Sequence, residues 1–174
     1  MFWCSVLSAW LSLSTSLAGS KGFYLDVPYV HQVENYCGPA VLSMVFRYWD
    51  RPADQYQLSE HWKPFPRRGL SGSQLKESAL KHGFKAYSFA GDVDEVSGYL
   101  GQGIPVIVAI DSSSVTKSSN HFLLLVGHDI SRQEWIVHDP AEGAFSRRST
   151  VDFEKKWANL KNWSLIIFPD GVSQ

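Results

Sequence analysis

Cysteine is scarce in this sequence: only two of the 174 residues are cysteines, and Cys37 is the only one beyond position 4. The sequence also lacks an excess of charge of either sign, because 16 lysines and arginines balance 17 aspartates and glutamates. The longest basic runs are the pairs Arg67-Arg68 and Arg147-Arg148. This charge balance argues against a nucleic-acid-binding surface and against a polybasic membrane patch. No internal repeat or heptad pattern indicates a repeat protein or a coiled coil.

Charge is absent from the first twenty residues, where the apolar side chains end in the small-residue pattern "SLAG". This pattern fits the site that signal peptidase reads, with cleavage before Gly19. We therefore predict a signal peptide at 1–18, a folded domain at 19–174, and export to the periplasm or the exterior. No Lys or Arg precedes the apolar segment, so a different start codon or an amphipathic packing helix remain alternatives. The segment is short for a membrane span, and the mature chain is expected to contain none.

Hydrophobic periodicity predicts helices early in the chain and strands later. The composition, 44% hydrophobic and 19% charged, is that of a folded protein, and the length suits one domain. Together these features predict an α+β domain with N-terminal helices packed on a mostly antiparallel sheet. The expected helices are 38–49, 54–62, 73–82, 92–100 and 151–160, and the expected strands are 23–30, 84–90, 103–110, 121–129, 134–140 and 163–169.

Cys37 stands directly before the predicted helix 38–49, whose first turn tolerates Pro39. Once a signal peptide is removed, Cys37 is the only thiol left, so no intramolecular disulfide is possible. Such a cysteine is either sheltered in the core or reactive. The amides and the dipole of a helix N-terminus stabilise a thiolate, which favours a nucleophile. A cysteine nucleophile also needs a nearby histidine and a third group that fixes the imidazole.

The two late strands bring a histidine and a carboxylate together. Alternate residues of a strand share a face, and the segment 130–133 reads as the turn between the strands. If Gly127 pairs with Gln133, then His121 lies opposite Asp139. Any register in which the numbers of two paired residues add to an even number keeps His121 and Asp139 on one face. A slip of one residue separates them. The strand pattern therefore predicts an imidazole with a carboxylate beside it.

The other histidines of these strands, His128 and His138, are expected on the face opposite His121. This separation argues against a metal site built from the strand histidines and Asp139, and we expect neither a metal nor a cofactor. The sequence "GQG" at 101–103 is not a phosphate-binding loop, because no predicted strand precedes it.

Four segments resemble one family. In chain order, "VPYVHQVENYCGPAVLSMVFRYW", "GIPVIVAI", "HFLLLVGHD" and "VHDP" are similar to the papain-like bacteriocin-processing (double-glycine) cysteine peptidases and their stand-alone relatives. The resemblance runs from about Leu25 to Pro169. It implies a papain-like fold, with Cys37 as the nucleophile, His121 as the base and Asp139 as the group that orients the base. It also implies that Gln32 donates to the oxyanion hole, and a neutral amide suits that role.

The expected function is that of an exported cysteine peptidase that acts on a peptide or protein substrate. Two features depart from the family: Tyr36 stands where many relatives carry an acidic residue, and the chain ends soon after Pro169 without a transporter portion. We therefore expect a stand-alone member, and an export partner is unknown. An acyltransferase or amidase with the same residues is one alternative. A non-catalytic peptide-binding module is another, although such a module would be expected to lose Cys37, Gln32 or His121.

We predict that iodoacetamide alkylates Cys37 at mildly acidic pH faster than it alkylates a free model thiol. The helix start and a nearby histidine both raise the thiolate fraction. Labelling is followed by mass spectrometry, with Cys37→Ser as the control for reaction elsewhere. Labelling below pH 7 that is no faster than that of the model thiol would indicate a sheltered structural cysteine.

Overall fold

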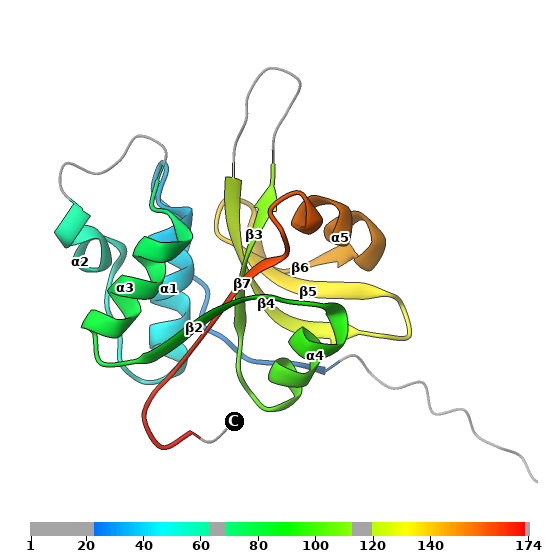
Figure 1. The fold of residues 1–174 in the computed structure, drawn as a ribbon, viewed down its shortest axis with the longest axis horizontal. Helices are drawn as coiled ribbons and strands as arrows, with labels where there is room; N and C mark the ends of the chain where they lie inside the picture. Colours follow the sequence, from blue (N-terminus) through cyan, green and yellow to red (C-terminus); the bar gives the residue numbers. More distant parts are fainter. Residues whose placement is uncertain (1–22, 63–68, 113–119, 173–174) are drawn as a thin grey trace, which may run out of the picture.

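The computed structural model describes residues 23–62, 69–112 and 120–172. Helices α1 to α3 gather on one side of the molecule, and the sheet lies on the other side with α4 and α5 against it (Figure 1). The predicted signal peptide at 1–18 lies outside the described residues. So does most of the serine-rich segment ahead of His121.

Within the described residues the sheet has seven strands, and all the paired strands run antiparallel. The order across the sheet is β2-β7-β3-β4-β5-β6, and β1 pairs with the end of β4 that extends beyond β3. The strands are β1 (Phe23–Tyr24), β2 (Lys85–Ala90), β3 (Val106–Asp111), β4 (Asn120–Asp129), β5 (Glu134–Asp139), β6 (Gly143–Ser149) and β7 (Trp163–Phe168).

The helices begin where the sequence supplies a cap. Asp54 and Ser71 each close a capping box with the glutamine three residues later, and Asp92 accepts from Glu95 N–H. These side chains satisfy backbone donors that have no partner within a helix. The helices are α1 (Cys37–Tyr48), α2 (Gln55–Ser59), the 3₁₀ turn η1 (Glu60–Trp62), α3 (Gly72–Lys81), α4 (Val93–Gly101) and α5 (Thr150–Ala158).

Helix α1 is the most deeply buried helix, because every residue from Gly38 to Phe46 is buried. Its apolar side chains join one core with the inner residues of β3, β4 and β7. Ser43, the polar residue in this run, donates to the carbonyl of Ala53 at 2.6 Å. The core therefore fixes the position of α1, including its first residue, against the sheet.

The pairing of β4 with β5 differs from the predicted register. Near the turn, His128 pairs with Trp135, and beyond a β-bulge Leu124 pairs with His138. The bulge inserts Val126 as an extra residue in β4. The numbers of paired residues therefore add to an odd number near the turn and to an even number beyond the bulge. The predicted pairing of Gly127 with Gln133 is wrong, but the even sum returns at the end of the strands that carries Asp139.

The bulge also overturns the predicted orientation of His128. Past Val126 the alternation of β4 is reversed, so His128 shares the face of His121 rather than the opposite face. Its ring stacks on Trp135 with a centroid distance of 4.0 Å, and its Nδ1 lies 2.9 Å from Ser97 Oγ. About seven residues of strand, roughly 23 Å, separate it from His121, so distance rather than orientation keeps them apart.

The architecture confirms an α+β domain with N-terminal helices beside a mostly antiparallel sheet. Two elements differ from the prediction: β1 covers two residues instead of 23–30, and the edge strand β6 was not expected. Within the described ranges no helix has the length and apolar character needed to cross a membrane.

Gly127 lets β1 approach β4 closely, and we predict that Gly127→Ala destabilises the fold by about 1–3 kcal/mol. An added Cβ would lie 2.4 Å from the Phe23 carbonyl oxygen and 2.7 Å from Tyr24 Cβ. Gly98→Ala, inside α4 with no neighbouring atom within 4 Å, is the matched control. It should stabilise by about 0.5–1 kcal/mol. Urea unfolding measures both, and an unchanged Gly127→Ala midpoint would contradict the close approach.

Candidate active site

Cys37 is the first residue of α1 and is half-buried, with a free thiol. The preceding residue, Tyr36, caps the helix without a side-chain hydrogen bond to its first turn. The positive end of the helix dipole therefore lies beside the thiol, as the sequence predicted.

His121 and Asp139 contact each other across β4 and β5. His121 Nε2 lies 2.8 Å from Asp139 Oδ1, and the two side chains are only 16% and 6% exposed. In the observed register Asp139 is diagonal to His121 rather than directly opposite, a spacing that long side chains bridge. The predicted His–Asp pair is confirmed as a contact.

The thiol of Cys37 lies near enough to the imidazole of His121 to raise the pKa of the histidine, so the pair joins the helix to the sheet. Because Nε2 faces Asp139, the nitrogen left for Cys37 is Nδ1. Burial, the largest influence, lowers the pKa of His121, but the hydrogen bonds and the charges of Asp139 and Cys37 together raise this pKa to about 9. The imidazole therefore holds its proton at neutral pH.

Three donors hold the carboxylate of Asp139. Oδ1 accepts from His121 and from the backbone N–H of Ala141 at 3.0 Å, and Oδ2 accepts from Arg148 at 3.3 Å. Burial raises the pKa of Asp139, but the bonds and charges of His121, Ala141 and Arg148 outweigh it and lower this pKa. Asp139 is an anion next to a protonated imidazole.

Gln32 lies in the segment between β1 and α1, and its backbone N–H donates to the carbonyl of Pro140 at 2.9 Å. This bond ties the segment to the residue that follows Asp139. The side-chain oxygen of Gln32 is buried and has no hydrogen-bond partner among the described residues. The backbone bond thus holds Gln32 beside the end of β5, while its buried amide oxygen is left without a partner in the described part of the chain.

Gln55, a buried residue of α2, holds the backbone on both sides of Gln32. Its Nε2 donates to the carbonyl of His31 at 2.8 Å, and its Oε1 accepts from the N–H of Val33 at 3.1 Å. Neither Gln55 nor Arg148 was singled out from the sequence. The contacts of Gln55 with the Gln32 segment and of Arg148 with Asp139 join elements that are distant along the chain. No local sequence pattern therefore predicts them.

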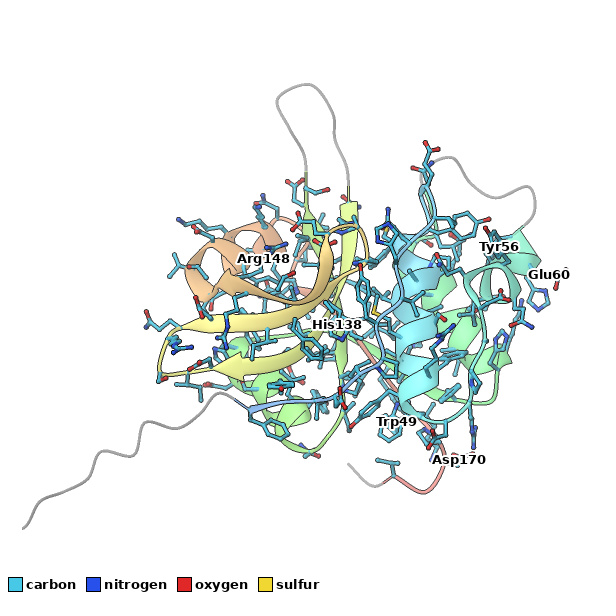
Figure 2. The ribbon with its side chains drawn as sticks, turned by 180° about the vertical axis from the view of Figure 1, so that it is seen from behind. Trp49, Tyr56, Glu60, His138, Arg148 and Asp170 are labelled. Carbon is cyan, nitrogen blue, oxygen red and sulfur yellow. The ribbon has the colours of Figure 1, made fainter. Side chains whose placement is uncertain are left out.

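His138 lies on the other side of β5, as predicted, and takes no part in the contacts of His121. Its ring is fully buried, Nε2 donates to the carbonyl of Val27 at 2.8 Å, and Nδ1 accepts from Phe145 N–H at 3.1 Å. Figure 2 shows His138 between the sheet and α1, and Arg148 beside α5. Burial lowers the pKa of His138, and both ring nitrogens are bonded in the neutral form.

Residues of this site line two pockets. One, of about 710 Å³, has Cys37 in its wall and lies between the helices and the sheet. The other, of about 390 Å³, includes His121 and Asp139 and is closed on one side by α5. Among the residues that the structure describes, no group of three or more His, Cys, Asp or Glu side chains is placed to hold a metal ion. The first pocket is lined chiefly by Gly69, Leu70, Gly72, Ala109, Phe122 and Trp163.

Solved structures share this fold. A protein described as a C39-like peptidase from Bacillus anthracis is 16% identical, with a TM-score of 0.73, over 85% of this chain and 98% of that one. The peptidase domain of Streptococcus ComA, a bifunctional ABC transporter of a quorum-sensing pathway, is 23% identical, with a TM-score of 0.67, over 81% and 97%. A double-glycine motif protease from an AMS/PCAT transporter, solved with its leader peptide, is 21% identical, with a TM-score of 0.68, over 84% and 94%.

The fold is therefore that of the papain-like peptidases. The family is identified by the sequence match: residues 24–165 match the Peptidase_C39-like family, and the chain belongs to that family. No curated protein matches the chain. The resemblance inferred from the sequence is confirmed at the level of the family.

The proton on His121 should make stability depend on pH. The folded pKa of about 9 lies above the ordinary value of 6.5, so this contribution is complete below about pH 6.5 and is lost as the pH rises through about 9. Urea unfolding of the native protein should therefore show stability that falls over this window. His121→Gln should flatten the fall, and an equal slope in both proteins would contradict the raised pKa.

Proposed function

We propose that this chain is a cysteine peptidase in which Cys37 is the nucleophile, His121 the acid and base, and Asp139 the orienting group. The observation that carries the proposal is the series of thiol, imidazole and carboxylate, in which His121 Nε2 lies 2.8 Å from Asp139 Oδ1 and Cys37 is near enough to raise the pKa of the imidazole. Such a series supplies a nucleophile, a proton carrier and a group that fixes the carrier. The protonated state of His121 at neutral pH supports a thiolate–imidazolium pair.

The reaction follows from this geometry. The thiolate of Cys37 attacks the carbonyl carbon of the scissile peptide bond, and the carbonyl oxygen becomes an oxyanion. His121 gives its proton to the leaving nitrogen as the C–N bond breaks, which leaves an acyl-thioester on Cys37. The neutral imidazole then takes a proton from water, which attacks the thioester and releases the acid and the thiolate. Asp139 holds the ring and stabilises its charged form throughout.

Gln32 is proposed to donate its side-chain amide N–H to the oxyanion, beside the backbone amide of Cys37. The backbone around Gln32 is held by Gln55 and by Pro140, and this support of the segment favours the proposal. A neutral amide cannot be deprotonated near pH 7 and stabilises charge that develops in the transition state.

The proposed substrate is an extended peptide or a protein segment. The pocket beside Cys37 has apolar walls from Leu70, Phe122 and Trp163 and is open to solvent between helices and sheet. Of the similar proteins, one double-glycine motif protease was solved with its leader peptide bound. The proposed place of action is the periplasm or the exterior, on the basis of the uncharged segment 1–18.

The function is tested by incubating residues 19–174 with a diverse peptide pool and identifying new termini by mass spectrometry. We expect cleavage by the native protein and none by Cys37→Ala. Products that carry a new amide instead of a free acid would indicate acyl transfer to an amine. An unchanged peptide pool, with the protein folded, would contradict the peptidase.

Substitution of Gln32 separates oxyanion stabilisation from structure. Gln32→Ala should keep the melting temperature and lower turnover by about 100- to 1000-fold, the usual effect of one oxyanion donor. Gln102→Ala, which changes an exposed glutamine at the end of α4, is the matched control. Near-native turnover of Gln32→Ala would remove Gln32 from the site.

The same assay distinguishes the strand residues. His121→Ala should abolish turnover, and Asp139→Ala should impair it severely. His138→Ala should chiefly lower the melting temperature, because it leaves the carbonyl of Val27 and the N–H of Phe145 without their partner. A well-folded His138→Ala protein without activity, together with an active Asp139→Ala protein, would contradict the assignment.

A further inference from the structure

The carboxylate of Asp139 has a second cationic neighbour besides His121. Its Oδ2 accepts from Arg148 Nη2 at 3.3 Å, and the same nitrogen contacts Glu142. Arg148 belongs to β6, the edge strand beside β5, and its side chain is one-third exposed at the rim of the smaller pocket. The charges therefore alternate in sign from His121 to Asp139, Arg148 and Glu142.

We propose that Arg148 is a positioning residue that acts through Asp139 to set the pH range over which His121 keeps the proton it shares with Cys37. This inference rests on the proposed function, in which Cys37 and His121 work as a pair. Neither Arg148 nor Glu142 touches the reacting atoms in this arrangement.

Geometry gives Arg148 two effects on Asp139. Its N–H group occupies Oδ2, so Oδ1 stays directed at His121 and at the N–H of Ala141. Its charge also favours the ionised carboxylate and offsets part of the negative field at His121. Removal of that charge should make both Asp139 and His121 easier to protonate.

Glu142 should have the opposite effect. Its carboxylate is largely exposed and shares the guanidinium of Arg148 with Asp139. Loss of the Glu142 charge would leave Arg148 to act on Asp139 alone, and would also remove a negative charge near His121. The two neighbours of Asp139 are therefore expected to shift the titration of His121 in opposite directions.

Other groups around the pair do not bond to this carboxylate in the described part of the chain. Tyr29 donates to the backbone carbonyl of Asp139, not to its side chain. The pocket that contains His121 and Asp139 is also lined by residues of α5. Several titratable and charged groups face the pair. From the helical side these are Cys37 of α1 and Tyr29 of the segment before α1. From the sheet and α5 they are Glu142 of the turn after β5, Arg147 and Arg148 of β6, and Asp152 and Lys156 of α5.

The test is the titration of His121 by nitrogen-15 NMR, with its signal assigned by comparison with His121→Ala. From a native midpoint of about 9, Arg148→Gln should raise the midpoint by about 0.5–1 pH unit, and Glu142→Gln should lower it. Arg148→Lys should restore most of the native value. Arg147→Gln is the matched control, because Arg147 lines the same pocket but pairs with Asp129 and Glu134 rather than with Asp139, and it should shift the midpoint much less than Arg148→Gln does.

A second background tests whether Arg148 acts through Asp139. With Asp139→Asn in place, addition of Arg148→Gln should shift the midpoint by less than half of the shift in the native background, because only the direct effect of the Arg148 charge on His121 remains. A full shift in that background, or no shift in the native one, would overturn the proposal. If Arg148→Gln does not fold, Arg148→Lys and Glu142→Gln still test the proposal. The His121 midpoint must stay near the native value in Arg148→Lys and must fall in Glu142→Gln.

NMR keeps this inference separate from the proposed function. The titration of His121 is read without any peptide substrate, so it is measured even if the protein cleaves nothing. The pH dependence of Cys37 alkylation gives a second reading, and its basic inflection should move with the His121 midpoint. A native inflection that His121→Ala leaves in place would count against the Cys37–His121 pair itself. A static inflection in Arg148→Gln alone would count only against Arg148.

Discussion

The packing of α1 against β4 is the constraint on which the site depends. Cys37 lies on the helix and His121 on the strand, and neither element alone brings a thiol to an imidazole. The burial of α1 from Gly38 to Phe46 makes this packing part of the main core. A change that shifts α1 by about 1 Å would alter the approach of thiol to imidazole, and such displacements weaken catalysis strongly. Stability and chemistry are thus joined in one interface.

The site also concentrates charge where water is largely excluded. An isolated buried carboxylate is costly, but Asp139 is bonded on both oxygens, and its positive neighbours are His121 and Arg148. The neutral His138, on the other face of β5, is satisfied by backbone groups alone. The two faces of one short strand therefore hold an ionised network and a neutral hydrogen-bonded histidine.

Much of the fold and the core of the site could be predicted from the sequence. Long apolar periodic segments marked α1, β3, β4 and β7, and the alternation of the two late strands placed His121 near Asp139. The bulge at Val126 could not be foreseen, because it is an irregularity of pairing that leaves no mark in the residue pattern. The prediction of the pair succeeded because the bulge lies nearer the turn and the even register returns beyond it.

The missed elements have a common physical reason. The edge strand β6 reads "GAFSRRS" and has no buried residue, so it lacks the alternation that reveals a half-buried strand. Arg148 on β6 and Gln55 on α2 reach the site by contacts with residues far away in the chain. The sequence indicates which side chains can react. It does not indicate which other side chains support them, because those contacts form only in the tertiary structure.

The position of β7 bears on the order in which the molecule assembles. β7 follows every other strand in the chain, yet it lies inside the sheet between β2 and β3. Its first residue, Trp163, lies in the pocket wall that also contains Cys37, and packs closely on Gly72. Until β7 inserts, β2 and β3 each present an unpaired edge, and the wall beside the thiol is incomplete. When the chain is synthesised from its N-terminus, β7 emerges last, so the wall beside the thiol is completed only in a late folding step. Segments of the same chain that are still unfolded therefore encounter an incomplete cleft.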